Sequence, residues 1–335
     1  MSGPLVLRVA ASVTVLWFVL RVVGGAAFAD GVRAVSWPAV VAAVTLTAVT
    51  TVCCAWRWRV VARVLGVDLG WRRAVGAYYR SLFLNSVLIG GVVGDVHRAV
   101  SHGRRAGDVS RGVRAVGWER LWGQLVQAVV TVVVLLVLPS PVRAALVFVV
   151  AGIAGVGVVA VGVGLAVRGG VGRGRSRLAR AATAVGDDVR RGGLLAGGVW
   201  PRLTVASVLN VVGHTATFVV AARVAGSTAP LGELVALLLV VQTAAVIPLS
   251  VGGWGPREGV AAWAFAAAGF GAAAGVTIAT LYAVLMLVAV LPGAGLLLGD
   301  AVHRGRGRGP GRGPGHPDKS RQPEPAPPTL ERVRG

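Results

Sequence analysis

The chain has 335 residues, of which 55% are hydrophobic and 14% charged, and it carries a formal net charge of +21. Soluble domains contain about 25% charged residues, so this composition excludes a soluble globular protein and predicts an integral membrane protein. The aromatic residues do not alternate with the arginines as a base-stacking surface requires, so we expect no nucleic acid among its partners.

The apolar stretches are long and unbroken, unlike the short alternating strands of an outer-membrane barrel. A helix of about 20 apolar residues crosses the hydrocarbon core of a bilayer. The first stretch is too long for a signal peptide and another follows it at once, so we interpret it as a retained helix. We therefore predict an all-α polytopic protein with about eight transmembrane helices, at residues 5–28, 36–56, 119–138, 143–167, 203–225, 234–250, 256–272 and 276–299.

The basic residues are distributed unevenly between the two ends of these helices. The links on one side hold only Arg33, whereas 27 of the 34 Lys and Arg residues lie in four stretches, 56–80, 97–114, 168–202 and 303–335. This asymmetry predicts a multi-pass protein of the cell (plasma) membrane with both termini in the cytoplasm. We expect a transmembrane domain over residues 1–302 and a disordered tail, rich in Arg, Gly and Pro, over 303–335.

One shorter apolar segment, residues 80–96, has basic residues on both flanks. A full crossing would place one basic flank outside the cell, so we interpret the segment as re-entrant on the cytoplasmic side. The alternative is an interfacial helix that lies flat on the membrane.

Two glycine-rich interruptions, each followed by charged residues, break otherwise apolar sequence. Such glycines allow the chain to turn within the membrane, and charge at that depth is by default a hypothesis about function. The alternative is that these are ordinary helix-end charges at the interface. The turns are formed by Gly90, Gly91 and Gly94, followed by Asp95, His97 and Arg98, and by Gly252, Gly253 and Gly255, followed by Arg257 and Glu258.

The charged residues of both breaks suit an anionic head group. A guanidinium makes two charge-assisted hydrogen bonds to a phosphate where an ammonium offers a point charge. We expect Arg98 and Arg257 to contact phosphate, with Asp95 and Glu258 orienting them. Asn85 precedes the first break and is a further candidate substrate-binding residue.

A third polar cluster, Glu119 and Arg120, opens the predicted span 119–138. We expect it to close the cavity, and a helix-capping role for Glu119 is the alternative. Gln124 and Gln127 share one face of the same helix and either line a cavity or bond between helices. His214, in the span 203–225, has two interpretations, a packed and satisfied histidine or a catalytic one.

Sequence signatures of catalysis are weak or missing. The chain has no Gly-x-Ser-x-Gly, His-Glu-x-x-His or phosphate-binding Gly-x-x-x-x-Gly-Lys-Ser/Thr motif. The longest internal hydrophilic loop, 168–202, is too short for a soluble transferase domain. Adjacent Cys53 and Cys54 imply neither a disulfide nor a zinc site. We therefore expect no enzymatic activity, no cofactor and no metal.

The order and spacing of four segments resemble the lysylphosphatidylglycerol synthase transmembrane family, also called flippase-like, over about residues 5–300. These segments are 83–85, 91–98, 119–120 and 248–259. The chain departs from the family pattern at two places. Ser86 stands where the family usually has a second Asn, and Val92 and Val93 are inserted into its Gly-Gly-Asp motif. The resemblance implies a polytopic fold that moves lipids, without the cytoplasmic domain that attaches the amino acid in full-length synthases.

The leading hypothesis is translocation of an anionic or lipid-linked substrate through a polar intramembrane cavity. The expected partners are membrane lipids. The second hypothesis is a non-catalytic scaffold or accessory subunit that presents a lipid to a separate glycosyl- or aminoacyl-transferase. A membrane-embedded transferase is a third.

Overall fold

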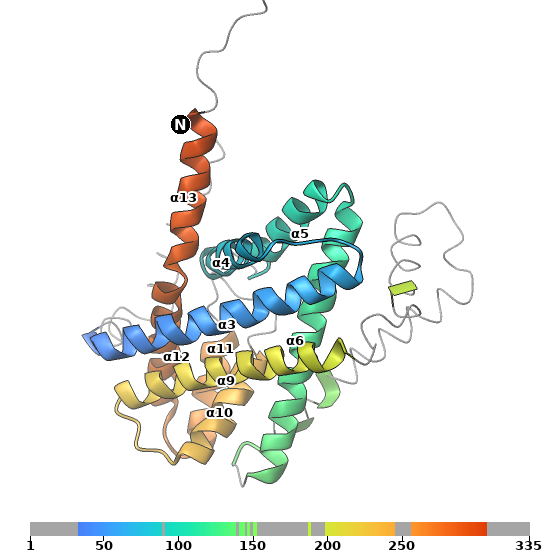
Figure 1. The fold of residues 1–335 in the computed structure, drawn as a ribbon. Coiled ribbons are helices and arrows are strands. Elements are labelled where there is room, and N and C mark those ends of the chain that lie inside the picture. The colour runs from blue at the N-terminus through green and yellow to red at the C-terminus, as the bar shows by residue number, and fades with distance from the viewer. Residues whose placement is uncertain are drawn as a thin grey trace, which may run out of the picture. The chain divides into compact units, whose positions relative to one another are not determined.

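The computed structural model describes residues 33–88, 91–138, 141–144, 146–147, 150–152, 187–188, 198–244 and 256–306. Among these residues the regular structure is helical, with no β-strand (Figure 1). Met1–Leu297 form one compact unit and Leu298–Gly335 a second, and every side-chain contact described below lies within the first. The helices in chain order are α3 (Trp37–Val64), α4 (Trp71–Val87), α5 (Val93–Arg105), α6 (Val109–Val137), α9 (Trp200–Val224), α10 (Leu231–Ala244), α11 (Pro256–Ala267), α12 (Ala272–Ala289) and α13 (Leu291–Arg306).

Four described helical runs are long and apolar enough to cross a membrane, so the prediction of an all-α membrane protein is confirmed. They are α3, α6, α9 and the run Ala272–Val302, which combines α12 with much of α13. They correspond to the predicted spans 36–56, 119–138, 203–225 and 276–299. The predicted spans 234–250 and 256–272 correspond to α10 and α11, which have only 14 and 12 residues.

Several predicted features fall on residues outside the described ranges. They are the span 5–28, most of the span 143–167, the tail from residue 307 onward, and the turn residues Gly90, Gly252, Gly253 and Gly255.

The segment predicted as one short re-entrant piece, residues 80–96, is the meeting point of two helices, α4 and α5. Gly91 turns the chain between them with a φ of 61°. The two helices fold back on each other at close range, since a Cβ on Gly94 would lie 2.1 Å from the Ser81 carbonyl oxygen. The first turns of α4 and the last turns of α5 are basic, so hydropathy detected only the apolar part of the two helices and gave the predicted segment bounds that are too narrow.

The second half of the described chain repeats the organisation of the first, beginning with the long helices α3 and α9. Both begin with a Trp-Pro pair, and proline is favoured in the first helical turn. Both end in Arg-Val-x-Gly, with the glycine in the left-handed region at a φ of 76° for Gly66 and 82° for Gly226. The amides of Gly66 and Val67 bond back to the carbonyls of Arg63 and Ala62, as in a Schellman motif, and the second helix end has the same bonds.

After each long helix come two short helices and another long helix: α4, α5 and α6 in the first repeat, α10, α11 and α12 in the second. Each final long helix packs against the preceding short one through a glycine in its first turns. A Cβ on Gly112 would lie 2.4 Å from the Ala99 carbonyl oxygen, and one on Gly275 would lie 2.3 Å from that of Ala261. These close approaches explain why glycine is required at both positions.

The two repeats are inverted with respect to each other. Helices α3 and α9 run antiparallel, as three contacts between them show: Thr50 meets Gly213, Cys54 bonds Asn210 and Arg57 bonds Ser207. Figure 1 shows the same antiparallel course for α3 in blue and α9 in yellow. Inverted repeats with broken helices are typical of membrane transporters, whose substrate sites lie between the repeats.

Candidate functional site

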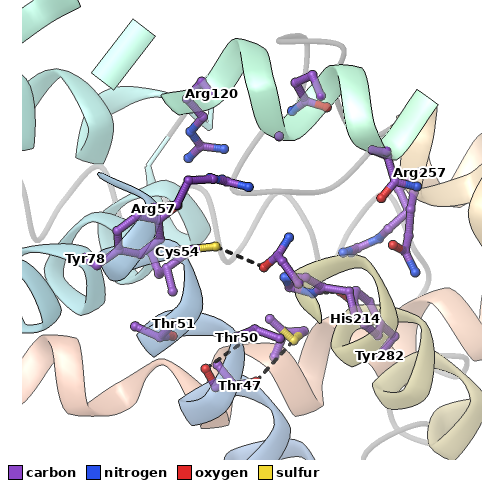
Figure 2. Close-up of a pocket in the computed structure, with 17 residues that line it drawn as sticks. Thr47, Thr50, Thr51, Cys54, Arg57, Tyr78, Arg120, His214, Arg257 and Tyr282 are labelled. Carbon is purple, nitrogen blue, oxygen red and sulfur yellow. Dashed lines mark hydrogen bonds between the residues drawn. The ribbon is translucent and has the colours of Figure 1, made fainter. Parts of the chain in front are cut away.

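A polar cavity of about 250 Å³ lies between the two repeats (Figure 2). Arg57 and Arg120 lie at one side of it, and Arg257, His214 and Tyr282 lie at the other. The first repeat contributes Thr47, Arg57, Tyr78, Arg120, Gln124 and Gln127 to its lining, and the second contributes Asn210, His214, Gln242, Arg257 and Tyr282. Within the described part of the chain, no group of three His, Cys, Asp or Glu side chains converges as a metal site would require.

Glu119 in α6 is the centre of a buried ion-pair network beside this cavity. Its side chain is 0% exposed, and it accepts hydrogen bonds from three helices. Arg57 donates through Nε at 2.9 Å and also through Nη2, Arg98 donates through Nη2 at 3.0 Å, and Tyr78 donates through its hydroxyl at 3.2 Å. Burial raises the pKa of Tyr78 well above its ordinary value, so the hydroxyl keeps the proton that it donates. Glu119 therefore joins α3, α4, α5 and α6.

Asp95 in the first turn of α5 is the second acidic member of the network. It pairs with Arg98 at 3.0 Å and with Arg120, and it accepts hydrogen bonds from Ser81 and Asn85, each at 3.0 Å. The Asn85 side chain also accepts a bond of 2.7 Å from the Gly94 amide, so it fastens the end of α4 to the start of α5. These bonds fix the geometry of the first break.

Arg98 was predicted to contact phosphate, but it lies away from the cavity. Its residue is 1% exposed, it does not line the cavity, and its guanidinium lies 4.6 Å from the Trp58 ring centroid and 4.3 Å from that of Tyr78. Its charge is used to hold Asp95 and Glu119. Arg120, predicted only to close the cavity, lines it at this end together with the buried Arg57, and 39% of the Arg120 side-chain surface is exposed.

His97 is exposed on another face of α5, 3.5 Å from the Ser101 hydroxyl, and does not line the cavity. His102 lies on the buried face of α5 instead, with its ring centroid 5.2 Å from that of Trp58. Burial, together with the nearby charges of Arg98 and Arg105, lowers the pKa of His102, so that its imidazole is neutral at pH 7.

The second break contributes the predicted Arg257–Glu258 pair at the start of α11. Arg257 donates to Glu258 through Nε at 3.0 Å and through Nη2 at 2.6 Å, and its guanidinium lies 5.3 Å from the Tyr282 ring centroid. Glu258 is therefore placed to orient Arg257, which lines the cavity. His214 bonds the Tyr282 hydroxyl at 2.8 Å on the same wall, which agrees with the interpretation of a packed and satisfied histidine.

Sequence reasoning missed Arg57, which it counted as part of a basic stretch that sets topology. The structure places Arg57 in the interior of α3 at 4% exposure, where it bonds Glu119 and, at 2.8 Å, Ser207. Gly123 in α6 makes room for it, because a Cβ there would lie 2.8 Å from the Arg57 Nη1 atom. The signal that could have found it is the apolar run that leads up to Arg57 without a break, together with the apolar residues between it and Arg63, which place the charge within the helix.

Comparison with known families assigns the chain. A sequence model of the family described as Lysylphosphatidylglycerol synthase TM region matches residues 5–293. The chain belongs to this family. Among curated proteins no significant match is found. Membership identifies a membrane protein with a lipid-related role.

In this lysylphosphatidylglycerol synthase TM region, the segments that carried the resemblance converge in space. One hydrogen-bonded network joins residues from three of these segments, namely Asn85, Asp95, Arg98 and Glu119. This network holds Arg120, which lines the cavity from the first repeat, and Arg257 lines it from the motif of the second.

Proposed function

We propose that this protein translocates membrane lipids whose head groups contain phosphate, by admitting the head group to the cavity between its two repeats while the acyl chains remain in the bilayer. The proposal includes no chemical step, so the protein acts as a transporter and not as an enzyme. It acts in the plasma membrane, with both termini in the cytoplasm, as the distribution of basic residues predicts.

The observation that carries the proposal is the position of the polar cavity at the interface of two inverted repeats. Both repeats supply its walls, the first with Arg120, which pairs with Asp95 of α5, and the second with Arg257, which pairs with Glu258 of α11. In transporters built from inverted repeats, the substrate site lies at this place and the two halves rock around it. A lipid-related family description agrees with a lipid as the substrate.

Arg120 and Arg257 are the proposed phosphate contacts. They lie on opposite walls of the cavity, one from each repeat (Figure 2). Asp95 and Glu258 hold them in place, and neighbouring amide and hydroxyl groups complete the site. A phosphate that moved between the two walls would exchange one guanidinium for the other without losing a charged partner.

The test is lipid movement by the purified chain. Proteoliposomes containing phosphatidylglycerol with a fluorescent acyl chain are treated with dithionite, which bleaches only the outer leaflet. Translocation predicts that bleaching proceeds beyond the outer-leaflet fraction seen in protein-free vesicles. Bleaching that stops at this fraction, together with a transferase that co-purifies in a fixed ratio, contradicts translocation and supports the scaffold hypothesis.

A further inference from the structure

His214 is the residue of the described cavity wall whose type suits it to bind a proton near neutral pH. It lies in α9, is half-buried, and lines the cavity on the same side as Arg257 and Tyr282 (Figure 2). An imidazole in water titrates at about pH 6.5, whereas thiols, phenols and guanidinium groups, which are the other titratable types in this lining, titrate at about pH 8.5 or above. A histidine at such a place is a candidate proton site.

The bond between His214 and Tyr282 is compatible with both charge states of the ring. The Nδ1 atom lies 2.8 Å from the hydroxyl oxygen. A neutral imidazole can accept the hydroxyl proton there, and an imidazolium donates to the hydroxyl oxygen instead. Both ring nitrogens of an imidazolium are donors, so the second nitrogen and the released Tyr282 hydroxyl proton can both turn to an acceptor in the cavity. The ring can therefore take up a proton and keep the bond that holds it in place.

The charged groups that share the described lining with His214 are cations. Its helix α9 packs against α3, α6, α10 and α12, and of these α10 contributes only the neutral amide of Gln242 to the lining. The titratable and charged groups of the other helices are three arginines, two tyrosines and a cysteine, namely Arg57 and Cys54 of α3, Tyr78 of α4, Arg120 of α6, Arg257 of α11 and Tyr282 of α12.

The carboxylates close to this wall are already paired with its arginines. Asp95 is held by Arg120, Glu119 by Arg57 and Glu258 by Arg257, and none of the three is part of the described lining. Like charge nearby disfavours a protonated imidazole, and an anion nearby favours it. An anion that enters the cavity therefore changes the surroundings of His214 in the direction that promotes proton binding.

The two repeats differ at this position. His214 and Cys54 lie the same number of residues before Gly226 and Gly66, the glycines that follow their helices. Cys54 is buried and lies 3.1 Å from the side-chain oxygen of Asn210 across the repeat interface. A thiol ordinarily titrates well above neutral pH. The pair of equivalent positions thus supplies one proton site and not two, which predicts one proton for each anion.

We propose that His214 is a proton-binding site of the cavity and that it takes up one proton when an anion binds there. The proton comes from water and forms an N–H bond on the imidazole. Because linkage is reciprocal, an anion that promotes protonation binds more tightly, by the same factor, where the imidazole is protonated. The inference rests on the proposed function only for a lipid as the source of the anion. A head group with one negative charge would then cross together with a proton, so a pH difference across the membrane could drive its movement.

The test uses the full chain purified in an uncharged detergent and dimethyl phosphate, a diester that keeps its single negative charge between pH 5 and pH 8. Calorimetric titration in buffers of different ionisation enthalpy measures the protons taken up for each anion bound. We expect uptake that approaches about one proton, and affinity that rises by about fivefold or more from pH 8 to pH 5.5, the lower end of the usual coupling between two ligands. Binding without proton uptake across this range overturns the inference, and so does the absence of binding.

Two variants assign the proton to a residue. His214→Gln removes the proton site and keeps an amide that can bond the Tyr282 hydroxyl, so it should bind dimethyl phosphate without proton uptake and with an affinity that does not depend on pH. His97→Gln is the matched control, because His97 is exposed on α5 and does not line the cavity, and its proton uptake should equal that of the wild type. Uptake that persists in His214→Gln, or that is lost equally in both variants, overturns the assignment.

A measurement on the wild type covers the case in which His214→Gln does not fold. Nuclear magnetic resonance of protein labelled at the histidine Cε1 carbon reports the charge of each imidazole at pH 7. Addition of dimethyl phosphate should shift one histidine signal toward the protonated form. No such shift in any histidine signal overturns the inference.

The lipid assay described above separates this inference from the proposed function. If phosphatidylglycerol moves across the bilayer but dimethyl phosphate binds without proton uptake, translocation stands and the proton site falls. If protons are taken up with dimethyl phosphate but no lipid moves, translocation fails and His214 remains the proton site for a soluble anion.

Discussion

Replacement of Glu119 by Gln tests whether the buried network holds the first repeat together. Glu119 is fully buried and neutralises Arg57 and Arg98, which are 4% and 1% exposed. A glutamine keeps one acceptor oxygen but turns an NH₂ group toward a guanidinium that can only donate. Removal of one partner from a buried ion pair costs about 3–5 kcal/mol, because it leaves an uncompensated charge.

The assay is reversible unfolding in mixed micelles with increasing dodecyl sulfate, followed by tryptophan fluorescence, which gives the free energy of unfolding. The matched control is Asp108→Asn, which loses the exposed pair with Arg111. Asparagine caps a helix about as well as aspartate, so the cap of α6 is retained. We expect a loss of about 1 kcal/mol or less in the control.

A second variant separates the charge from the packing. Glu119→Gln combined with Arg57→Met removes the uncompensated charge as well, and replacement of a buried ion pair by neutral groups is often neutral or stabilising. We therefore expect the double variant to be more stable than Glu119→Gln alone. The reasoning is refuted if Glu119→Gln costs no more than Asp108→Asn, or if the second substitution adds a further loss.

Two other changes probe the close packing and the titration of the first repeat. Gly94→Ala should lower the free energy of unfolding by about 1–3 kcal/mol, as overpacking does, because the new Cβ would lie 2.1 Å from the Ser81 carbonyl oxygen. Gly117 has open space around it, so Gly117→Ala should stabilise α6 by up to about 1 kcal/mol. Similar effects of both substitutions on the unfolding midpoint would contradict the contact. The lowered pKa of His102 means that the unfolded chain binds a proton more readily than the folded protein, so stability should fall as the pH drops below about 6.5. His102→Gln should reduce that fall between pH 7 and pH 5, and unchanged pH dependence would show that His102 does not contribute to it.

The helical class and four of the membrane spans could be predicted from the sequence because long apolar runs have few alternatives in a bilayer. The boundaries of α4 and α5 could not. Their outer turns are polar and basic, so hydropathy detects only the apolar part of the hairpin. The repeat was visible only as two similar glycine-rich breaks, and its inverted course required the contacts between α3 and α9.

The sequence predicted several of the residues that gather at the candidate site, but it did not predict which of them line the cavity and which hold others in place. Asp95 opens the short helix α5 as the pattern indicates, whereas Glu119 and Arg120 lie in the interior of the long helix α6, which begins at Val109 and is capped by Asp108, so the predicted start at 119 and the capping role of Glu119 were wrong. The sequence could not distinguish Arg98 from Arg120, since which arginine faces the cavity depends on helix rotation and on the aromatic rings that cover Arg98. Arg57 was assigned to topology for a similar reason, because a charge count does not report depth.

The rate at which purified protein moves fluorescent phosphatidylglycerol across the bilayer, compared between wild type, Arg120→Gln and Arg111→Gln, tests the central claim most directly. Arg120 faces the cavity, whereas Arg111 lies in an exposed pair on the same helix, so the two variants lose the same charge in different places. We predict rapid movement for wild type and Arg111→Gln and a loss of about tenfold or more for Arg120→Gln, the size expected for one charge-assisted contact. Equal rates in all three proteins, or no movement above that in protein-free vesicles, would contradict translocation through this cavity.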